Sequence, residues 1–144
     1  MAIIIRVLGP DDTAVLEQVA VDVFDNEVDP RWSAEFLADP RHHLAVALDD
    51  GQVVGMASAV HYVHPDKPPE LWINEVAVAP SHHHRGIGRQ LLDALFARGR
   101  TLGCQEAWVL TEQNNAAARG LYGAVGGVEA PEPVVMVTFA LATQ

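Results

Sequence analysis

The order of elements in this sequence predicts an α/β (α+β) domain, with a mixed, mostly antiparallel sheet covered by helices. Two β-rich runs, residues 43–48 and 52–63, flank Asp50-Gly51, a dipeptide that favours a tight hairpin between antiparallel strands. Farther along, β-rich and amphipathic helical runs alternate, which is typical of crossovers between parallel strands. The 144 residues suffice for one core, so we expect residues 1–144 to form a single domain.

The N-terminal half supplies four predicted strands and two predicted helices. A β-rich run at residues 3–8 ends at a Gly-Pro pair, and capping residues then open a helix over residues 11–24 with one apolar face. A second helix is predicted to begin at Asp29-Pro30, because Asp caps a helix and Pro fits its first turn. The hairpin strands follow, and a strongly apolar strand over residues 71–79 comes next.

The C-terminal half supplies two more helices and two or three strands. The clearest is an amphipathic helix over residues 86–102, since apolar residues recur on one face and a glycine follows its end. A strand over residues 107–110, a helix over residues 115–125 and a closing strand over residues 134–141 come after it. With a short strand near Val128, the expected sheet has six to seven strands flanked by four helices.

The charge of the chain excludes several classes of partner. Nineteen acidic residues against nine lysines and arginines give a formal net charge of −10, which repels nucleic acids and anionic membranes. The charge is uneven: residues 1–40 carry a net −7, and residues 81–103 carry +3. We expect an anionic ligand near the basic stretch and a cationic one elsewhere; acidity that serves only solubility is the alternative.

Hydropathy and cysteine usage predict a cytoplasmic protein without a metal. Apolar runs fall short of the roughly 18 residues that a membrane span needs, and residues 1–10 lack the basic leader of an export signal. The lone Cys104 excludes an internal disulfide framework and a cysteine-based zinc site. The consecutive histidines at 82–84 are not expected to hold an ion, because adjacent residues rarely converge on one metal.

The stretch from Glu75 to Arg89 has the most chemical content. It takes an apolar strand into a glycine-bearing loop that opens a helix. Gly86 and Gly88 let the backbone approach a ligand, the first N–H groups of a helix bind anionic oxygens, and Arg85 and Arg89 add positive charge. The pattern predicts a phosphate-binding loop; the alternative is a tight turn with solvated arginines. Two other phosphate-binding loops fit less well. Gly88 is not followed by the Lys-Ser/Thr pair of a nucleotide-triphosphate loop, nor by the third glycine of a dinucleotide-binding loop.

These residues resemble the acetyl-CoA loop of the GCN5-related N-acetyltransferase (GNAT) family. The run Asn115-x-x-Ala118-x-x-Leu121-Tyr122 resembles that family's second signature, and His83 stands where family members usually have Gln or Arg. The resemblance implies acetyl-CoA as the cofactor and no metal. The residues that it implies for cofactor binding are Val76, Ala77, Val78, His83, His84, Arg85, Gly86, Ile87, Gly88, Arg89, Asn115 and Ala118. For Asn115, a helix cap is an equal alternative.

Within this family, the chain is most similar to the aminoglycoside 3-N-acetyltransferases. The similarity lies in short pieces at residues 8–11, 22–24, 53–55, 62–65 and 135–139. It implies acetyl transfer to a primary amine of a cationic small molecule, by direct attack in a ternary complex, with antibiotic resistance as the outcome and a homodimer as the assembly. The alternatives are a GNAT acetyltransferase for another polyamine, amino sugar or peptide amine, and a non-catalytic acyl-CoA-binding domain.

Two residues are candidates for catalysis. Glu75 stands in the apolar strand, where alternation places it on the face of Leu71, Ile73 and Ala77, and burial there would raise its pKa toward the range of a general base. The family has a carboxylate near this point that takes a proton from the substrate ammonium; a structural glutamate is the alternative. By resemblance, Tyr122 protonates the leaving thiolate; a core aromatic residue is the alternative. A backbone N–H within residues 76–78 is expected to stabilise the oxyanion.

Acidic side chains are the candidates for binding the cationic amine. Three of them cluster between the first two predicted helices, where the family often builds its acceptor wall, and two lie farther along the chain. For each, an ordinary solvated acid is the alternative. The candidates are Asp25, Glu27, Asp29, Glu112 and Glu132.

Overall fold

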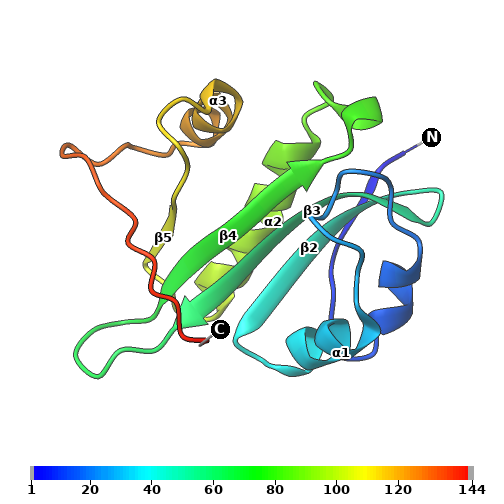
Figure 1. Ribbon diagram of the computed structural model, residues 1–144, viewed down its shortest axis with the longest axis horizontal. Helices are drawn as coiled ribbons and strands as arrows, with labels where there is room; N and C mark the ends of the chain where they lie inside the picture. The colour runs from blue at the N-terminus through cyan, green and yellow to red at the C-terminus, as the bar shows by residue number, and fades with distance from the viewer. Residues whose placement is uncertain (1, 143–144) are drawn as a thin grey trace.

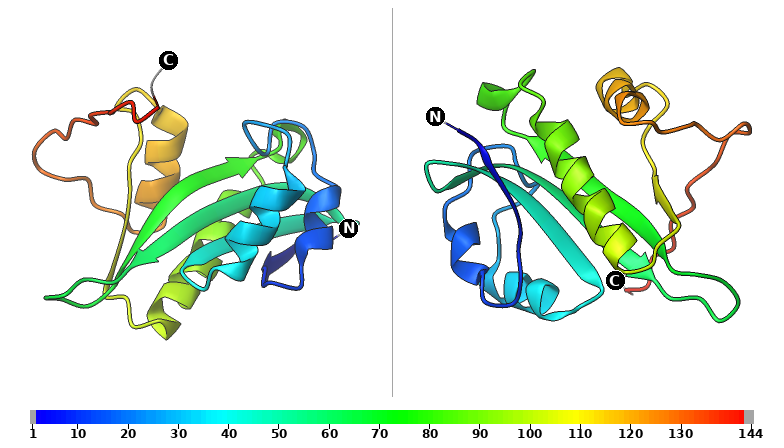
Figure 2. Two further views of the ribbon diagram at one scale, coloured as in Figure 1. Left: turned by 60° about the horizontal axis from the view of Figure 1, so that its bottom comes forward. Right: turned by 180° about the vertical axis from the view of Figure 1, so that it is seen from behind.

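A computed structural model describes residues 2–142 as one five-stranded sheet with helices on both faces (Figure 1). Helix α2 (Ile87–Thr101) lies along one face, and helix α1 (Pro30–Ala38) and the short 3-10 helix η1 (Thr13–Glu17) lie on the other (Figure 2). In spatial order the strands are β1 (Ile4–Val7), β2 (His42–Asp49), β3 (Gln52–Tyr62), β4 (Glu70–Val78) and β5 (Glu106–Val109).

The sheet is mixed and mostly antiparallel, as predicted. Strands β1 to β4 pair antiparallel in sequence order, and β5 pairs parallel to β4. The β2–β3 hairpin turns at Asp50 and Gly51, whose φ angles are 50° and 80°. These positive angles are what a tight hairpin turn requires, so the turn that the Asp-Gly pair predicted is confirmed.

Three of the four expected helices form where the sequence predicts them. They are α1, α2 and α3 (Ala116–Ala124), and the side chain of Asp29 caps α1 by accepting a hydrogen bond from Arg31 N at 2.8 Å. The apolar face of α2, with Ile87, Leu91 and Leu95 fully buried, packs across the middle of the sheet and forms the core with it. Within residues 2–142, no helix combines the length and the hydropathy that a membrane crossing requires.

The expected count of six to seven strands and four helices is wrong. The helix predicted over residues 11–24 shortens to η1, because the chain then forms a bridge between Val19 and Val53, with Ala20 N donating to Val53 O at 2.8 Å. Among described residues after α3, neither the strand over residues 134–141 nor the one near Val128 forms. An alternating apolar pattern is insufficient there, because these residues pair with no neighbouring strand.

One irregularity of the sheet changes the face to which the side chain of Glu75, the candidate base, points. Ser58 pairs with Glu75, but the next residue of β3, Ala59, pairs with Ile73, so Asn74 is an extra residue in β4. Ile73 points to the α2 face, and the extra residue turns Glu75 to the α1 face. The expectation that Glu75 shares a face with Leu71 and Ile73, buried among apolar neighbours, is therefore wrong, and Glu75 is exposed.

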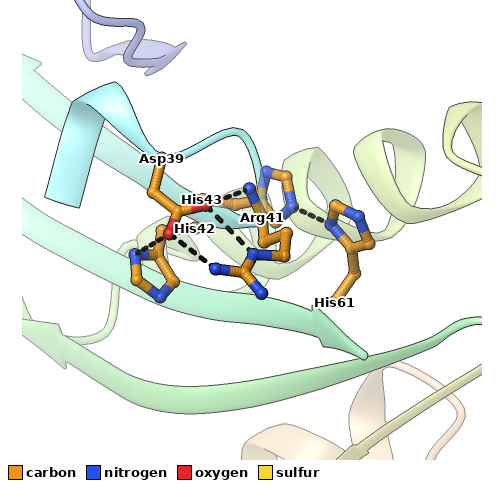
Figure 3. A network of polar contacts seen from close by, with 5 residues as sticks. All are labelled: Asp39, Arg41, His42, His43 and His61. Carbon is orange, nitrogen blue, oxygen red and sulfur yellow. Dashed lines mark hydrogen bonds and ion pairs between the residues drawn. The ribbon is translucent and has the colours of Figure 1, made fainter. Parts of the chain in front are cut away.

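A pair of histidines, one buried and one partly buried, lies at the far end of β2 and β3 from the hairpin turn (Figure 3). His43 is 2% exposed, and its Nε2 lies 2.8 Å from Nδ1 of His61. Burial lowers the pKa of His43 to about 4, and the charges of His61 and Arg98 act in the same direction. The ring of His43 is therefore neutral over the physiological range of pH.

Candidate active site

A groove of about 470 Å³ opens where β4 and β5 separate. The parallel pairing stops at Ile73, so residues 76–78 of β4 have no neighbouring strand on that side, and α3 lies across the gap (Figure 1). The groove is lined by the end of β4, the loop and first turn of α2, and one face of α3. The lining residues are Val76, Ala77, Val78, His82, His83, His84, Gly86, Ile87, Gly88, Arg89, Asn115, Ala117, Ala118, Leu121 and Tyr122.

The structure brings together eleven of the twelve residues expected to bind the cofactor. Arg85 is the exception, because its exposed side chain does not line the groove. Three lining residues were missed: His82, Ala117 and Leu121. The helical periodicity of α3, which places Ala117 and Leu121 beside Ala118 and Tyr122, could have indicated the first two residues. No sequence signal distinguishes His82 from its neighbours.

The N-terminus of α2 presents unpaired backbone N–H groups to this groove. Gly86 is the N-cap residue, at a φ of 75°, and no side chain caps the helix. The first helical hydrogen bond runs from Gln90 N to Gly86 O at 3.2 Å, so the N–H groups of Ile87, Gly88 and Arg89 precede the helical ladder. With the positive end of the helix dipole and the Arg89 guanidinium, they form a binding site for anionic oxygens.

Gly88 brings α2 and α3 together beside that anion site. A Cβ atom at Gly88 would lie 3.1 Å from Cδ2 of Leu121, closer than side-chain atoms normally approach. The second glycine of the loop motif therefore serves helix packing as well as access for a ligand. This contact sets the width of the groove between α2 and α3.

Each of the three consecutive histidines has its own contact. His82, at the end of the 3-10 helix η2 (Pro80–His82), has Nε2 2.7 Å from Asp49 Oδ2. His83 has Nε2 2.7 Å from Val78 O and donates to that carbonyl, while the ring of His84 meets the His83 ring edge-on at 6.1 Å. Among residues 2–142, no group of three or more His, Cys, Asp or Glu side chains is arranged to hold a metal ion.

Helix α3 presents two of the predicted residues to the groove. Asn115 is its N-cap, and Oδ1 accepts from Ala118 N at 3.0 Å, so the alternative of a helix cap is confirmed for a residue that also lines the groove. Tyr122 lies one to two turns farther on, and burial raises the pKa of its phenol. The phenol is therefore protonated at neutral pH and can donate a hydrogen bond into the groove.

Glu75 lies between the groove and a second, acidic cavity in its contacts along the chain and in its charge coupling. It directly precedes Val76, the first lining residue of the groove. Partial burial raises the pKa of Glu75, and the negative charge of Asp25 raises it further. Glu75 lines neither cavity, but Asp25 lines the second one, so the carboxyl group of Glu75 lies within electrostatic range of that cavity.

The acidic cavity, of about 650 Å³, lies between η1 and the start of α1. Asp25 and Glu27, two of the five carboxylates predicted to bind the amine, line it, together with Glu17 and Asp22, which were not predicted because they fell on the expected helix. The other three predicted carboxylates lie elsewhere: Asp29 caps α1, and Glu112 and Glu132 are exposed and line neither cavity.

Two curated proteins show similarity to this chain. The aminoglycoside N(6')-acetyltransferase type 1 of Salmonella typhimurium is 32% identical over 90 residues, which are 58% of this chain and 62% of that protein. The N-alpha-acetyltransferase RimI of Mycobacterium tuberculosis is 35% identical over 92 residues, which are 62% of this chain and 54% of that protein. In both cases the match spans less than two thirds of the relative.

A solved structure shares the fold over nearly the whole chain. AAC(6')-Iy in complex with the bisubstrate analogue CoA-S-monomethyl-acetylneamine superposes with a TM-score of 0.79 at 23% identity, covering 97% of this chain and 99% of that chain. The Salmonella enzyme and AAC(6')-Iy are both named as 6'-acetyltransferases, so the expected resemblance to the 3-N enzymes is not supported.

The strand, loop and helix that form the groove lie inside one family match. Residues 8–126, most of the chain, match the acetyltransferase (GNAT) family, and the match includes β4, the loop, α2 and α3. The chain therefore belongs to the acetyltransferase (GNAT) family.

Proposed function

We propose that the protein is an acetyl-CoA-dependent N-acetyltransferase that acts on a primary amine of a cationic small molecule. The observation that carries the proposal is the groove at the N-terminus of α2, together with an acidic cavity that lies within electrostatic range of Glu75. The groove fits the coenzyme, because unpaired N–H groups and Arg89 suit a diphosphate and the apolar residues of β4 and α3 suit its arm. The acidic cavity suits a cation.

Glu75, Tyr122 and the backbone at the end of β4 each have a separate role in the transfer. Bound acetyl-CoA supplies an activated acetyl thioester. Glu75 takes the proton from the substrate ammonium, directly or through a water molecule, so that the neutral amine can attack. The backbone N–H groups of residues 76–78 stabilise negative charge on the carbonyl oxygen, and Tyr122 donates its proton to the departing thiolate. Both reactants are held in one ternary complex, which requires no covalent enzyme intermediate.

An aminoglycoside is the proposed acceptor. A polycationic amine matches the carboxylates of Glu17, Asp22, Asp25 and Glu27, and the similarity to a Salmonella enzyme named for aminoglycosides supports the same class. The sequence resemblance favours the 3-N position and the relatives favour the 6' position. A peptide amine is the second candidate, because the mycobacterial relative is named as an N-alpha-acetyltransferase.

The release of free thiol from acetyl-CoA tests the function and the acceptor together. The panel contains an aminoglycoside with both a 3-amine and a 6'-amine, a linear polyamine, an amino sugar and a short peptide, and NMR of the product identifies the acetylated nitrogen. Rapid turnover of the aminoglycoside supports the proposal. Faster turnover of the peptide would show that a peptide amine, and not an aminoglycoside, is the acceptor. Binding of acetyl-CoA without turnover of any amine would support the non-catalytic alternative.

We also propose that the protein acts as a homodimer in the cytoplasm, where acetyl-CoA is supplied. Side chains of the C-terminal segment, residues 134–141, are between 67% and 95% exposed at its large apolar positions, and β5 has one free edge within residues 2–142. A second copy would cover these side chains. Light scattering should show a dimer that Phe139→Lys weakens and the matched control Thr138→Lys does not. A monomer at all concentrations contradicts the dimer.

A further inference from the structure

The loop between β4 and α2 is connected to the β2–β3 hairpin by a hydrogen bond between two side chains. Asp49 is the last residue of β2, and its Oδ2 lies 2.7 Å from Nε2 of His82. His82 stands in η2 and lines the coenzyme groove, whereas Asp49 lines neither cavity. The contact therefore connects the groove to a part of the fold that the proposed mechanism does not use.

Both members of the pair are shielded from solvent. The side chains of His82 and Asp49 are 14% and 27% exposed, so salt screens their attraction less than that of a surface pair. The hydrogen bond from His82 lowers the pKa of Asp49, which keeps the carboxylate charged at neutral pH. Oγ of Ser81 lies 2.7 Å from Nδ1 of His82, so a hydroxyl that donates there leaves Nε2–H to donate to Asp49. Both ring nitrogens thus have fixed partners.

Further contacts hold the same loop at its base. Ala79 N donates to Val54 O at 2.8 Å, which ties the end of β4 to β3. The His83 ring donates to Val78 O and closes the turn after the strand. The contact between His82 and Asp49 is the one of these that a substitution in the hairpin can remove, because its acceptor is a side chain of the hairpin.

We propose that Asp49 is a positioning residue for coenzyme binding: through His82 it holds the loop of residues 80–86 so that the N–H groups at the start of α2 face the diphosphate of acetyl-CoA. Asp49 acts only through His82. The inference rests on the proposed function, because it assumes that the groove holds acetyl-CoA. It adds that the hairpin contributes to affinity for the diphosphate part of the coenzyme.

Comparing two acetyl donors tests this role. The donors are acetyl-CoA and S-acetylpantetheine, which carries the same thioester but no diphosphate. Asp49→Asn leaves a neutral amide oxygen as the acceptor and should weaken acetyl-CoA binding by about three- to tenfold, the usual difference between a charge-assisted and a neutral hydrogen bond. The value of kcat at saturating acetyl-CoA and the kcat/KM for S-acetylpantetheine should stay at the wild-type level.

Asp50→Asn is the matched control. It removes the same charge from the next residue, which is exposed and has a φ of 50°, a conformation that asparagine also adopts. Wild-type affinity in Asp50→Asn and weakened affinity in Asp49→Asn support the inference. Equal affinities in the two variants overturn it, as does an equal loss with both donors, because a general distortion of the site would affect them alike. A wild-type protein that binds no acetyl-CoA overturns the proposed function itself.

A double-mutant cycle tests whether Asp49 acts through His82. His82→Leu should weaken acetyl-CoA binding at least as much as Asp49→Asn, and adding Asp49→Asn to it should have no further effect. His82→Gln should regain part of the affinity, because its side-chain amide can donate to Asp49. Additive losses in the double variant would show that Asp49 acts by another route and overturn the assignment.

Discussion

Glu75 lies on the opposite face of the sheet from Ile73, although only Asn74 separates the two residues. In a regular strand, residues two apart share a face, and the shift in the β3–β4 register at Asn74 removes that relationship. As a result, the carboxyl group of Glu75 lies near Asp25 and the acidic cavity, away from α2. The placement of the proposed base therefore depends on one irregular residue.

Replacing Glu75 by Gln should lower kcat by about 10²- to 10⁴-fold at neutral pH, the usual contribution of a general base. Gln preserves the size of the side chain and cannot accept the proton of the ammonium. The deficit should narrow as the pH rises and the amine loses its proton to solvent. Initial rates across a pH series check both points, and wild-type rates in Glu75→Gln would remove Glu75 as the base.

The charge of Asp25 should be visible in the pH dependence of the wild-type enzyme. Because Asp25 raises the pKa of Glu75, Asp25→Asn should lower that pKa and move the acidic limb of the kcat/KM profile to lower pH. The variant should also have a higher KM for the cationic amine, because it removes a carboxylate from the acceptor cavity. An unmoved acidic limb would contradict the coupling of the two carboxyl groups.

Tyr122→Phe should separate chemistry from binding. Phe keeps the packing of the ring on α3 and loses the proton that the thiolate would receive, so kcat should fall by about tenfold or more while the Kd for acetyl-CoA changes little. Calorimetric titration with acetyl-CoA and steady-state rates measure the two quantities. The opposite pattern, with weakened binding and an intact kcat, would assign Tyr122 to the binding surface.

Gly86→Ala should destabilise the fold and weaken coenzyme binding. The φ of 75° is unfavourable for a residue with a Cβ atom, by about 1 to 2 kcal/mol, although the space around Gly86 is open. Gly123→Ala is the control: it lies in α3 with open space and no positive φ, so it should leave stability unchanged or raise it. Denaturant unfolding compares the two, and equal stabilities would contradict the argument from backbone conformation.

Stability should decrease as the pH falls from about 6.5 toward about 4. The pKa of His43 is lowered to about 4 in the folded protein, from 6.5 in the unfolded chain, so the unfolded chain binds the additional proton in this window. The full effect corresponds to roughly 3 kcal/mol. His43→Gln should flatten the dependence on pH, which unfolding in urea at several pH values measures. An equally steep loss of stability in the variant would place the responsible group elsewhere.

Local sequence patterns predicted the parts of the fold that depend on local chemistry. The Asp50-Gly51 hairpin, the Asp29 cap and the glycine-bearing loop all follow from the preferences of a few neighbouring residues. Eleven of the twelve residues predicted to bind the cofactor line the groove, because strand, loop and helix are contiguous in sequence there.

The features that were missed depend on distant partners. The bridge of Val19 to Val53 shortens the first predicted helix, and the register shift at Asn74 is set by pairing with β3. The segment 134–141 has the alternation of a strand but pairs with no strand of the described chain. The hydrophobic periodicity and composition of one segment contain no information on which distant segment it pairs with. These errors therefore share one physical cause.

The extra residue in β4 also constrains how this protein can vary. A deletion of Asn74 would restore regular pleating and rotate the Glu75 side chain toward the hydrophobic interior, and a second insertion would displace the whole anion-binding loop along the strand axis. Substitutions at this position leave the geometry intact, whereas changes in length do not. Natural and engineered diversity should therefore accumulate as insertions and deletions in the connecting loops, with the length of β4 held constant.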